Sequence, residues 1–203
     1  MGFFKRNFFA GVIAGIALTV VVGIGSLALI GYLMIRGGGF DFSPVPTLPE
    51  VGNLRSYGEP NASWRVNGLD GKTVRLGDLR GQPVFVNIWA SWCGPCVAEM
   101  PAIGRLYAEL HGQGVAFLVV SEEDVDTVRK FVKRENLAFP VYVSKDGLPP
   151  ELDSSGIPAT FILDGGGRVV FKRIGPAQWD AEPVRNFLLA LRSAPLSTVT
   201  PDE

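Results

Sequence analysis

Cysteine and histidine are scarce in this 203-residue sequence, which has two cysteines, Cys93 and Cys96, and one histidine, His111. Two cysteines cannot build a disulfide framework, so the fold must depend on a packed core. A zinc site on the two sulfurs would need two further ligands, and His111 alone does not supply them. The 19 basic and 20 acidic residues nearly balance, and no basic run stands out, which argues against a nucleic-acid partner.

Charged residues are missing altogether from residues 8–35, which are almost entirely apolar. As a helix, this run would span about 42 Å, more than the roughly 30 Å hydrocarbon core of a bilayer. Lys5 and Arg6 precede it, so the positive-inside rule predicts that residues 1–7 are cytoplasmic and the remainder is outside. We expect a single-pass signal-anchor helix in the cytoplasmic (inner) membrane, with the domain that follows it extracytoplasmic or periplasmic.

A cleaved signal peptide is the alternative, because Ser26-Leu27-Ala28 resembles a cleavage site. The apolar run, however, is longer than the 7–15 residues usual for a signal peptide. After it, residues 36–62 are rich in glycine and proline and predict a linker. We expect one folded domain over residues 63–193 and a polar tail over residues 194–203.

Within the domain, apolar strands alternate with amphipathic helices, and two segments have the pattern of hairpins. We expect a hairpin over residues 64–76, strands over 84–89, 115–120 and 139–144, helices over 94–111, 122–136 and 180–192, and a second hairpin over 159–174. Ser121 is the expected N-cap of the second helix. This order predicts an α/β sandwich around a mixed sheet.

Cys93 and Cys96 lie between the strand at residues 84–89 and the helix that begins at residue 94. A thiolate at a helix N-terminus faces unpaired N–H groups and the positive end of the helix dipole, which lowers a cysteine pKa from about 8.5 to roughly 3.5–7.5. We expect a redox-active disulfide in which Cys93, nearer to solvent, attacks and Cys96 resolves the mixed disulfide. A purely structural disulfide across so short a loop would contribute little.

The run Val-Asn-Ile-Trp-Ala-Ser-Trp-Cys-Gly-Pro-Cys at residues 86–96, followed by Glu99 and Pro101, resembles the active-site segment of the thioredoxin superfamily. Within that superfamily it is most similar to the membrane-anchored TlpA/ResA-type thiol-disulfide oxidoreductases. Residues 156–164 resemble the second signature of the superfamily, and the resemblance covers nearly all of residues 63–193. It implies a thioredoxin-like α/β/α sandwich with a mixed central sheet, preceded here by one transmembrane helix.

The resemblance also implies roles for individual residues. Pro158 would be cis and lie against the two sulfurs, so that the backbone of Ile157 can pair with an extended substrate segment. Gly94 and Pro95 match the intervening pair of reducing thioredoxins, and Trp92 offers an apolar contact to the substrate. An ordinary trans proline that opens a strand is the alternative for Pro158.

Glu99 follows Cys96 by three residues and therefore shares its helix face. A partly desolvated carboxylate there can accept or return the proton of Cys96, and TlpA/ResA-type proteins carry an acid at the matching position. The alternative is a solvated glutamate that the helix dipole favours. Asn87 replaces the buried aspartate of cytoplasmic thioredoxins, which leaves proton handling to Glu99, water or the substrate. Trp89 is expected in the core.

These observations favour an enzyme that reduces disulfides in exported proteins and receives its electrons from a transmembrane thiol electron donor. It needs no cofactor besides the Cys93–Cys96 disulfide and no metal. Apocytochrome c or metalloproteins under assembly are candidate substrates, although Ala159 stands where cytochrome c maturation reductases often carry a glutamate.

Two other functions stay open. A Cu(I) metallochaperone for oxidase assembly would use the two thiolates with Met100 close by. A disulfide oxidase or isomerase would have a reduction potential well above about −180 mV. A peroxidase is disfavoured, because no threonine–cysteine peroxidatic arrangement precedes Cys93.

Overall fold

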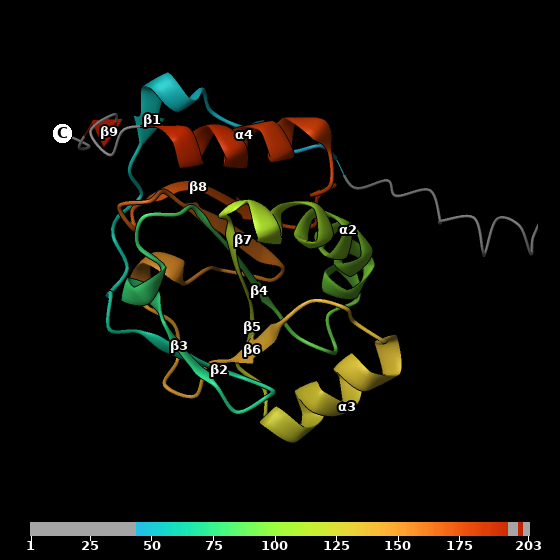
Figure 1. The fold of residues 1–203 in the computed structure, drawn as a ribbon. Coiled ribbons are helices and arrows are strands. Elements are labelled where there is room, and N and C mark those ends of the chain that lie inside the picture. Colours follow the sequence, from blue (N-terminus) through green and yellow to red (C-terminus); the bar gives the residue numbers. More distant parts are fainter. Residues whose placement is uncertain (1–43, 195–198, 201–203) are drawn as a thin grey trace, which may run out of the picture. The chain divides into compact units, whose positions relative to one another are not determined.

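The computed structural model describes residues 44–194 and 199–200 (Figure 1). The predicted signal anchor at residues 8–35 and the preceding residues 1–7 lie outside the described residues. Among the helices that are described, none combines the length and hydropathy needed to cross a bilayer.

A seven-stranded mixed sheet forms the centre of the domain. Its strands are β2 (Arg65–Gly68), β3 (Thr73–Arg75), β4 (Val84–Trp89), β5 (Ala116–Ser121), β6 (Val141–Val143), β7 (Ala159–Leu163) and β8 (Val169–Ile174). They lie in the order β3-β2-β6-β5-β4-β7-β8. β4, β5 and β6 are parallel to one another, whereas β7 is antiparallel to β4 and β8 is antiparallel to β7. The predicted mixed sheet, with both hairpins, is confirmed.

Three α-helices pack on this sheet: α2 (Gly94–Leu110), α3 (Val125–Glu135) and α4 (Glu182–Ser193). All three contribute to one core cluster together with one face of the strands. The connections β4–α2–β5 and β5–α3–β6 both lead to the next strand on the same side of the sheet. Because such parallel connections are right-handed, both helices lie on the same face.

The opposite face of the sheet is covered by shorter segments. Its core cluster combines strand residues with Trp64, Leu76 and Leu152, and none of the described α-helices contributes to it. Four 3-10 segments complete the described structure: η1 (Val51–Asn53), η2 (Leu76–Leu79), η3 (His111–Gln113) and η4 (Pro150–Leu152). The sheet is therefore mixed and thioredoxin-like as expected, but the α/β/α layering was wrong for the described part of the chain.

The helix predicted over residues 122–136 begins three residues later than expected. Ser121 is the last residue of β5 and pairs with Trp89 of β4, so its backbone belongs to the sheet. Asp124 caps α3 instead, because its carboxylate accepts the N–H of Asp126 at 2.9 Å. Serine and aspartate are comparable N-caps, and the sheet register decided between them.

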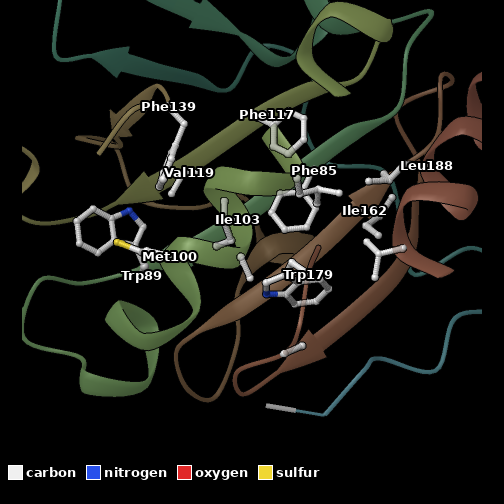
Figure 2. Packing of buried hydrophobic residues seen from close by; sticks show 14 of the residues in the cluster. Phe85, Trp89, Met100, Ile103, Phe117, Val119, Phe139, Ile162, Trp179 and Leu188 are labelled. Carbon is white, nitrogen blue, oxygen red and sulfur yellow. The ribbon is translucent and has the colours of Figure 1, made fainter. Parts of the chain in front are cut away.

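β4 is buried at all six positions, as expected for a central strand. Figure 2 shows how its Phe85 packs against Trp179, and the two rings meet edge to face with centroids 5.3 Å apart. Trp89, at the end of β4, is also buried, which confirms its predicted place in the core. The turn that carries the two cysteines thus starts from a strand that is buried along its whole length.

The predicted linker was too long, because residues 44–62 are part of the folded domain where the structure describes them. Leu54 is buried in the main core cluster. The N–H of Tyr57 donates to the carbonyl of Val169 at 2.8 Å, and the N–H of Val169 donates to the carbonyl of Gly58 at 2.9 Å. A few apolar and backbone contacts hold this segment against the domain. They could not be predicted, because a glycine- and proline-rich composition is typical of a linker.

The same N-terminal segment also forms a short second sheet. Its strand β1 (Leu54–Arg55) pairs in parallel with β9 (Val199–Thr200). Residues 199–200 belong to the predicted polar tail, and the structure shows that they pair with β1. Such a two-residue pairing depends on tertiary neighbours, which local sequence patterns do not reveal.

Replacing Leu54 with alanine should lower the free energy of unfolding by about 3 kcal/mol, because the change leaves a cavity in the core. Val45→Ala, at an exposed position nearby, is the matched control and should change stability by less than about 0.5 kcal/mol. Urea unfolding followed by tryptophan fluorescence measures both. Equal stability of the two variants would contradict the packing of this segment.

Candidate active site

The two cysteines lie at the start of α2, just beyond the carboxyl end of β4. They form a disulfide with an S–S length of 2.05 Å and a Cα–Cα distance of 5.3 Å, which confirms the predicted pairing. Cys93 is the N-cap of α2, and its sulfur accepts the N–H of Cys96 at 3.2 Å. Pro95 occupies the first turn of the helix, where its missing N–H costs no hydrogen bond.

Exposure distinguishes the residues of this turn. Trp92 is 74% exposed, whereas Cys93 is 5% and Cys96 only 1% exposed. Gly94 and Pro95 are exposed as well. The sulfur nearer to solvent is thus Cys93, in the order expected, and Trp92 presents the largest apolar surface beside it.

The peptide bond between Ile157 and Pro158 is cis, as the resemblance implied. The antiparallel register pairs Ile88 with Ala159, so Pro158 lies at the edge of the sheet from which the cysteine turn leaves. The carbonyl of Pro158 accepts the N–H of Gly175 at 2.8 Å. Pro158 is buried and Ile157 half-buried.

Ile174 is an exposed apolar residue at the same edge that the sequence reasoning missed. It is paired with Ala159 in the sheet and is the side chain nearest to Gly156. It could not be identified from the sequence, because an isoleucine at the end of a strand resembles an ordinary core residue. Trp92 and Ile174 are thus the two large exposed apolar side chains from the strand ends and turn described here.

Glu99 is fully buried, with 0% of its surface exposed, so the alternative of a solvated glutamate was wrong. Its carboxylate accepts hydrogen bonds from the side-chain amide of Asn87 at 2.8 Å, the indole N–H of Trp179 at 2.8 Å and the backbone N–H of Ala177 at 3.1 Å. Burial raises the pKa of Glu99 from 4.5 to about 7, and these three donors offset only part of that effect.

A polar row crosses the sheet beneath Glu99. The strand registers align Asn87 of β4, Thr160 of β7 and Arg173 of β8, so the three side chains share one face. The Asn87 amide also donates to the Thr160 hydroxyl at 2.9 Å. The positive charge of Arg173 acts to lower the pKa of Glu99. A buried carboxylate near half-ionisation at neutral pH can exchange a proton with a neighbouring thiol.

The other candidates lie outside this cluster. Met100 is buried in the core. His111 caps the end of α2, where its Nδ1 lies 2.8 Å from the carbonyl of Tyr107, and the two rings stack. Within residues 44–194 and 199–200, no group of three or more His, Cys, Asp or Glu side chains is placed to hold a metal ion.

Comparisons with known proteins agree with this geometry. The family model described as the AhpC/TSA family matches residues 57–172, more than half of the chain. The thiol-disulfide oxidoreductase ResA of Bacillus cereus is 37% identical over 120 residues, which cover 58% of this chain and 69% of that protein. ResA of Geobacillus thermodenitrificans is 34% identical over 139 residues, 68% of this chain and 79% of that protein.

Solved structures are similar as well. StoA from Bacillus subtilis has 26% sequence identity and a TM-score of 0.53, and the match covers 61% of this chain and 94% of that one. A thiol:disulfide interchange protein of the thioredoxin family from Chlorobium tepidum has 25% identity and a TM-score of 0.56, with 64% and 96% covered.

Proposed function

Because the chain belongs to the AhpC/TSA family and is a thiol-disulfide oxidoreductase with a thioredoxin-like fold, we propose that it reduces disulfides in exported proteins. One observation carries the proposal: the Cys93–Cys96 disulfide lies at a helix N-terminus next to an exposed tryptophan, and a cis proline lies at the same end of the sheet. That combination provides an activated sulfur, a partner sulfur to release it and a surface on which a polypeptide can lie.

In the first half-reaction, the reduced enzyme attacks with Cys93. Its thiolate is stabilised by the N-terminus of α2 and by the N–H of Cys96, which donates to this sulfur. The sulfur of Cys93 bonds to one sulfur of the substrate, and the disulfide bond of the substrate breaks. The second substrate sulfur leaves as a thiolate and takes a proton from solvent.

In the second half-reaction, Cys96 releases the substrate. Its thiol gives up a proton to the carboxylate of Glu99, directly or through a water molecule, and the resulting thiolate attacks the sulfur of Cys93. The bond between Cys93 and the substrate breaks, and the substrate sulfur leaves as a thiolate that takes up the proton Glu99 has received, directly or through solvent. The substrate has gained two electrons and two protons, and the enzyme ends as the disulfide described above.

A polypeptide substrate has several contacts available at this edge. Trp92 and Ile174 offer exposed apolar surface, and Gly94 and Pro95 are exposed as well. The half-buried Ile157 supplies backbone next to the cis bond for pairing with an extended segment. Backbone pairing reads no particular sequence, which suits an enzyme with several protein substrates.

The proposal includes the cell compartment and the source of electrons. The apolar run at residues 8–35 supports a single-pass anchor in the cytoplasmic membrane, with the domain outside. A reductase in an oxidising compartment needs electrons from across the bilayer, so its partner is a transmembrane protein that carries thiols. Fusion of a reporter that folds only outside the cytoplasm to the C-terminus tests this topology. An active reporter is expected, and an inactive one would contradict it.

The activity itself is tested on the full chain in detergent, with insulin as the disulfide and dithiothreitol as the electron source. We expect catalysed turnover and a reduction potential more negative than about −180 mV. A potential well above that value would instead indicate an oxidase or isomerase. Anaerobic Cu(I) titration of the reduced chain tests the metallochaperone alternative, which requires binding tighter than that of a simple dithiol.

A further inference from the structure

Glu123 lies in the loop between β5 and α3 and holds the residue that precedes Trp92. One carboxylate oxygen accepts the backbone N–H of Ser91 at 2.6 Å, and the other accepts the hydroxyl of Ser91 at 2.7 Å. The hydroxyl of Ser121 donates to the same carboxylate at 3.1 Å. Both oxygens of one glutamate are therefore committed to a turn that is 32 residues away in the sequence.

The sheet explains why these residues meet. β4 and β5 are parallel, and Trp89 pairs with Ser121, so both strands end at the same edge. The loop after β5 then runs beside the turn after β4. The N–H of Glu123 donates to the hydroxyl of Ser121 at 3.2 Å, which fixes the glutamate to the end of its own strand. Its half-buried position strengthens these charge-assisted hydrogen bonds.

The cysteine turn is thus held at two points. On the inner side, the N–H of Cys93 donates to the carbonyl of Ala90 at 3.1 Å. On the outer side, Glu123 binds Ser91. Trp92 lies between these two points. Because 74% of its surface is exposed, few neighbouring side chains can hold its ring, and its orientation depends on the backbone on either side.

We propose that Glu123 is a positioning residue that fixes Ser91 and so presents Trp92 to protein substrates. This inference rests on the proposed function and adds to it a preference for protein disulfides over small ones. A protein substrate gains from a Trp92 that is already oriented, because less side-chain and loop freedom is lost on binding. A small disulfide needs only to reach Cys93, so it gains little.

The test compares variants of the full chain on insulin and on a small aromatic disulfide. Glu123→Ala removes the acceptor for Ser91 and should raise KM for insulin about tenfold while kcat changes less than about twofold. The ratio of kcat/KM for insulin to that for the small disulfide should fall about tenfold. Glu122→Ala changes the exposed neighbouring glutamate and should behave as wild type.

Glu123→Gln separates hydrogen bonding from charge. Its amide oxygen can still accept the N–H of Ser91, and its amide N–H can donate to the hydroxyl of Ser91, so the wild-type KM for insulin should be nearly restored. Trp92→Ala should raise the insulin KM by a similar factor. If Glu123 acts through Trp92, the double variant will be no worse than Trp92→Ala alone.

Several results would overturn the inference: an insulin KM unchanged in Glu123→Ala, equal losses on both disulfides, a Glu123→Gln variant as poor as Glu123→Ala, or additive effects with Trp92→Ala. If Glu123→Ala fails to fold, Ser91→Ala replaces it, because that change removes the hydroxyl that donates to Glu123. It should also raise the insulin KM, and an unchanged KM would overturn the inference. A wild-type chain that reduces neither disulfide would instead refute the proposed function, and this inference with it.

Discussion

Replacing Cys93 with serine is expected to lower the rate of insulin reduction by at least about a thousandfold, because a serine hydroxyl stays protonated at neutral pH and does not attack a disulfide. Cys96→Ser should also stop turnover, but for a different reason. The attack by Cys93 still takes place, and the mixed disulfide then has no resolving sulfur. This variant should therefore accumulate covalent adducts with its substrates.

The two serine variants control for each other, since both lack the Cys93–Cys96 disulfide and differ only in which sulfur remains. Non-reducing electrophoresis of native membranes, with and without dithiothreitol, measures the adducts. Cys96→Ser should yield a small set of defined partners that Cys93→Ser does not. Only unspecific adducts, or equal trapping by both variants, would contradict the assigned order of attack and release.

The stability of the domain should depend on pH through Glu99. Folded Glu99 keeps its proton up to about pH 7, whereas in the unfolded chain it ionises near 4.5. Between these values the folded state binds more protons, so the free energy of unfolding falls as the pH rises and levels off above about pH 7. A shift of this size corresponds to at most about 3 kcal/mol.

Glu99→Gln should remove this fall in stability, because an amide does not titrate. The substituted amide can be accommodated if the side-chain amide of Asn87 turns over. The Asn87 oxygen, which has no hydrogen-bond partner among the described residues, would then accept from it. Urea unfolding at several pH values from about 5 to 8 measures the effect, with Glu122→Gln as the exposed control. If Glu122→Gln and Glu99→Gln showed the same dependence of stability on pH, the raised pKa of the buried Glu99 carboxylate would be contradicted.

The sequence allowed the parts of the fold that follow from local patterns to be predicted. The central strand at residues 84–89 is a nearly continuous apolar run, the helix after it and both hairpins have clear periodicity, and the structure contains them all. The layering of the helices could not be read in the same way, because it depends on the order of strands in the sheet. In the structure, β5 and β6 lie on the same side of β4, so both crossover helices are on one face of the sheet, and no local pattern indicates this order.

The site was predictable where residue type alone carries the chemistry, as for Cys93, Cys96 and Pro158. What surrounds Glu99 was not, because its partners Ala177 and Trp179 lie 78 and 80 residues further along the chain. Glu123 was missed for the same reason. A glutamate in a polar loop has no distinctive pattern, and only the shared end of β4 and β5 brings it to the cysteine turn.

The near-complete burial of Cys93 has a consequence for when the enzyme can act. With only 5% of this residue exposed, a substrate disulfide can reach it only on a polypeptide segment flexible enough to bend toward the cysteine turn. Under the proposed function, a newly exported polypeptide meets that condition, whereas a folded protein with a buried disulfide does not. We therefore expect slow-folding exported proteins to be reduced more often than fast-folding ones, because their disulfides stay accessible for longer.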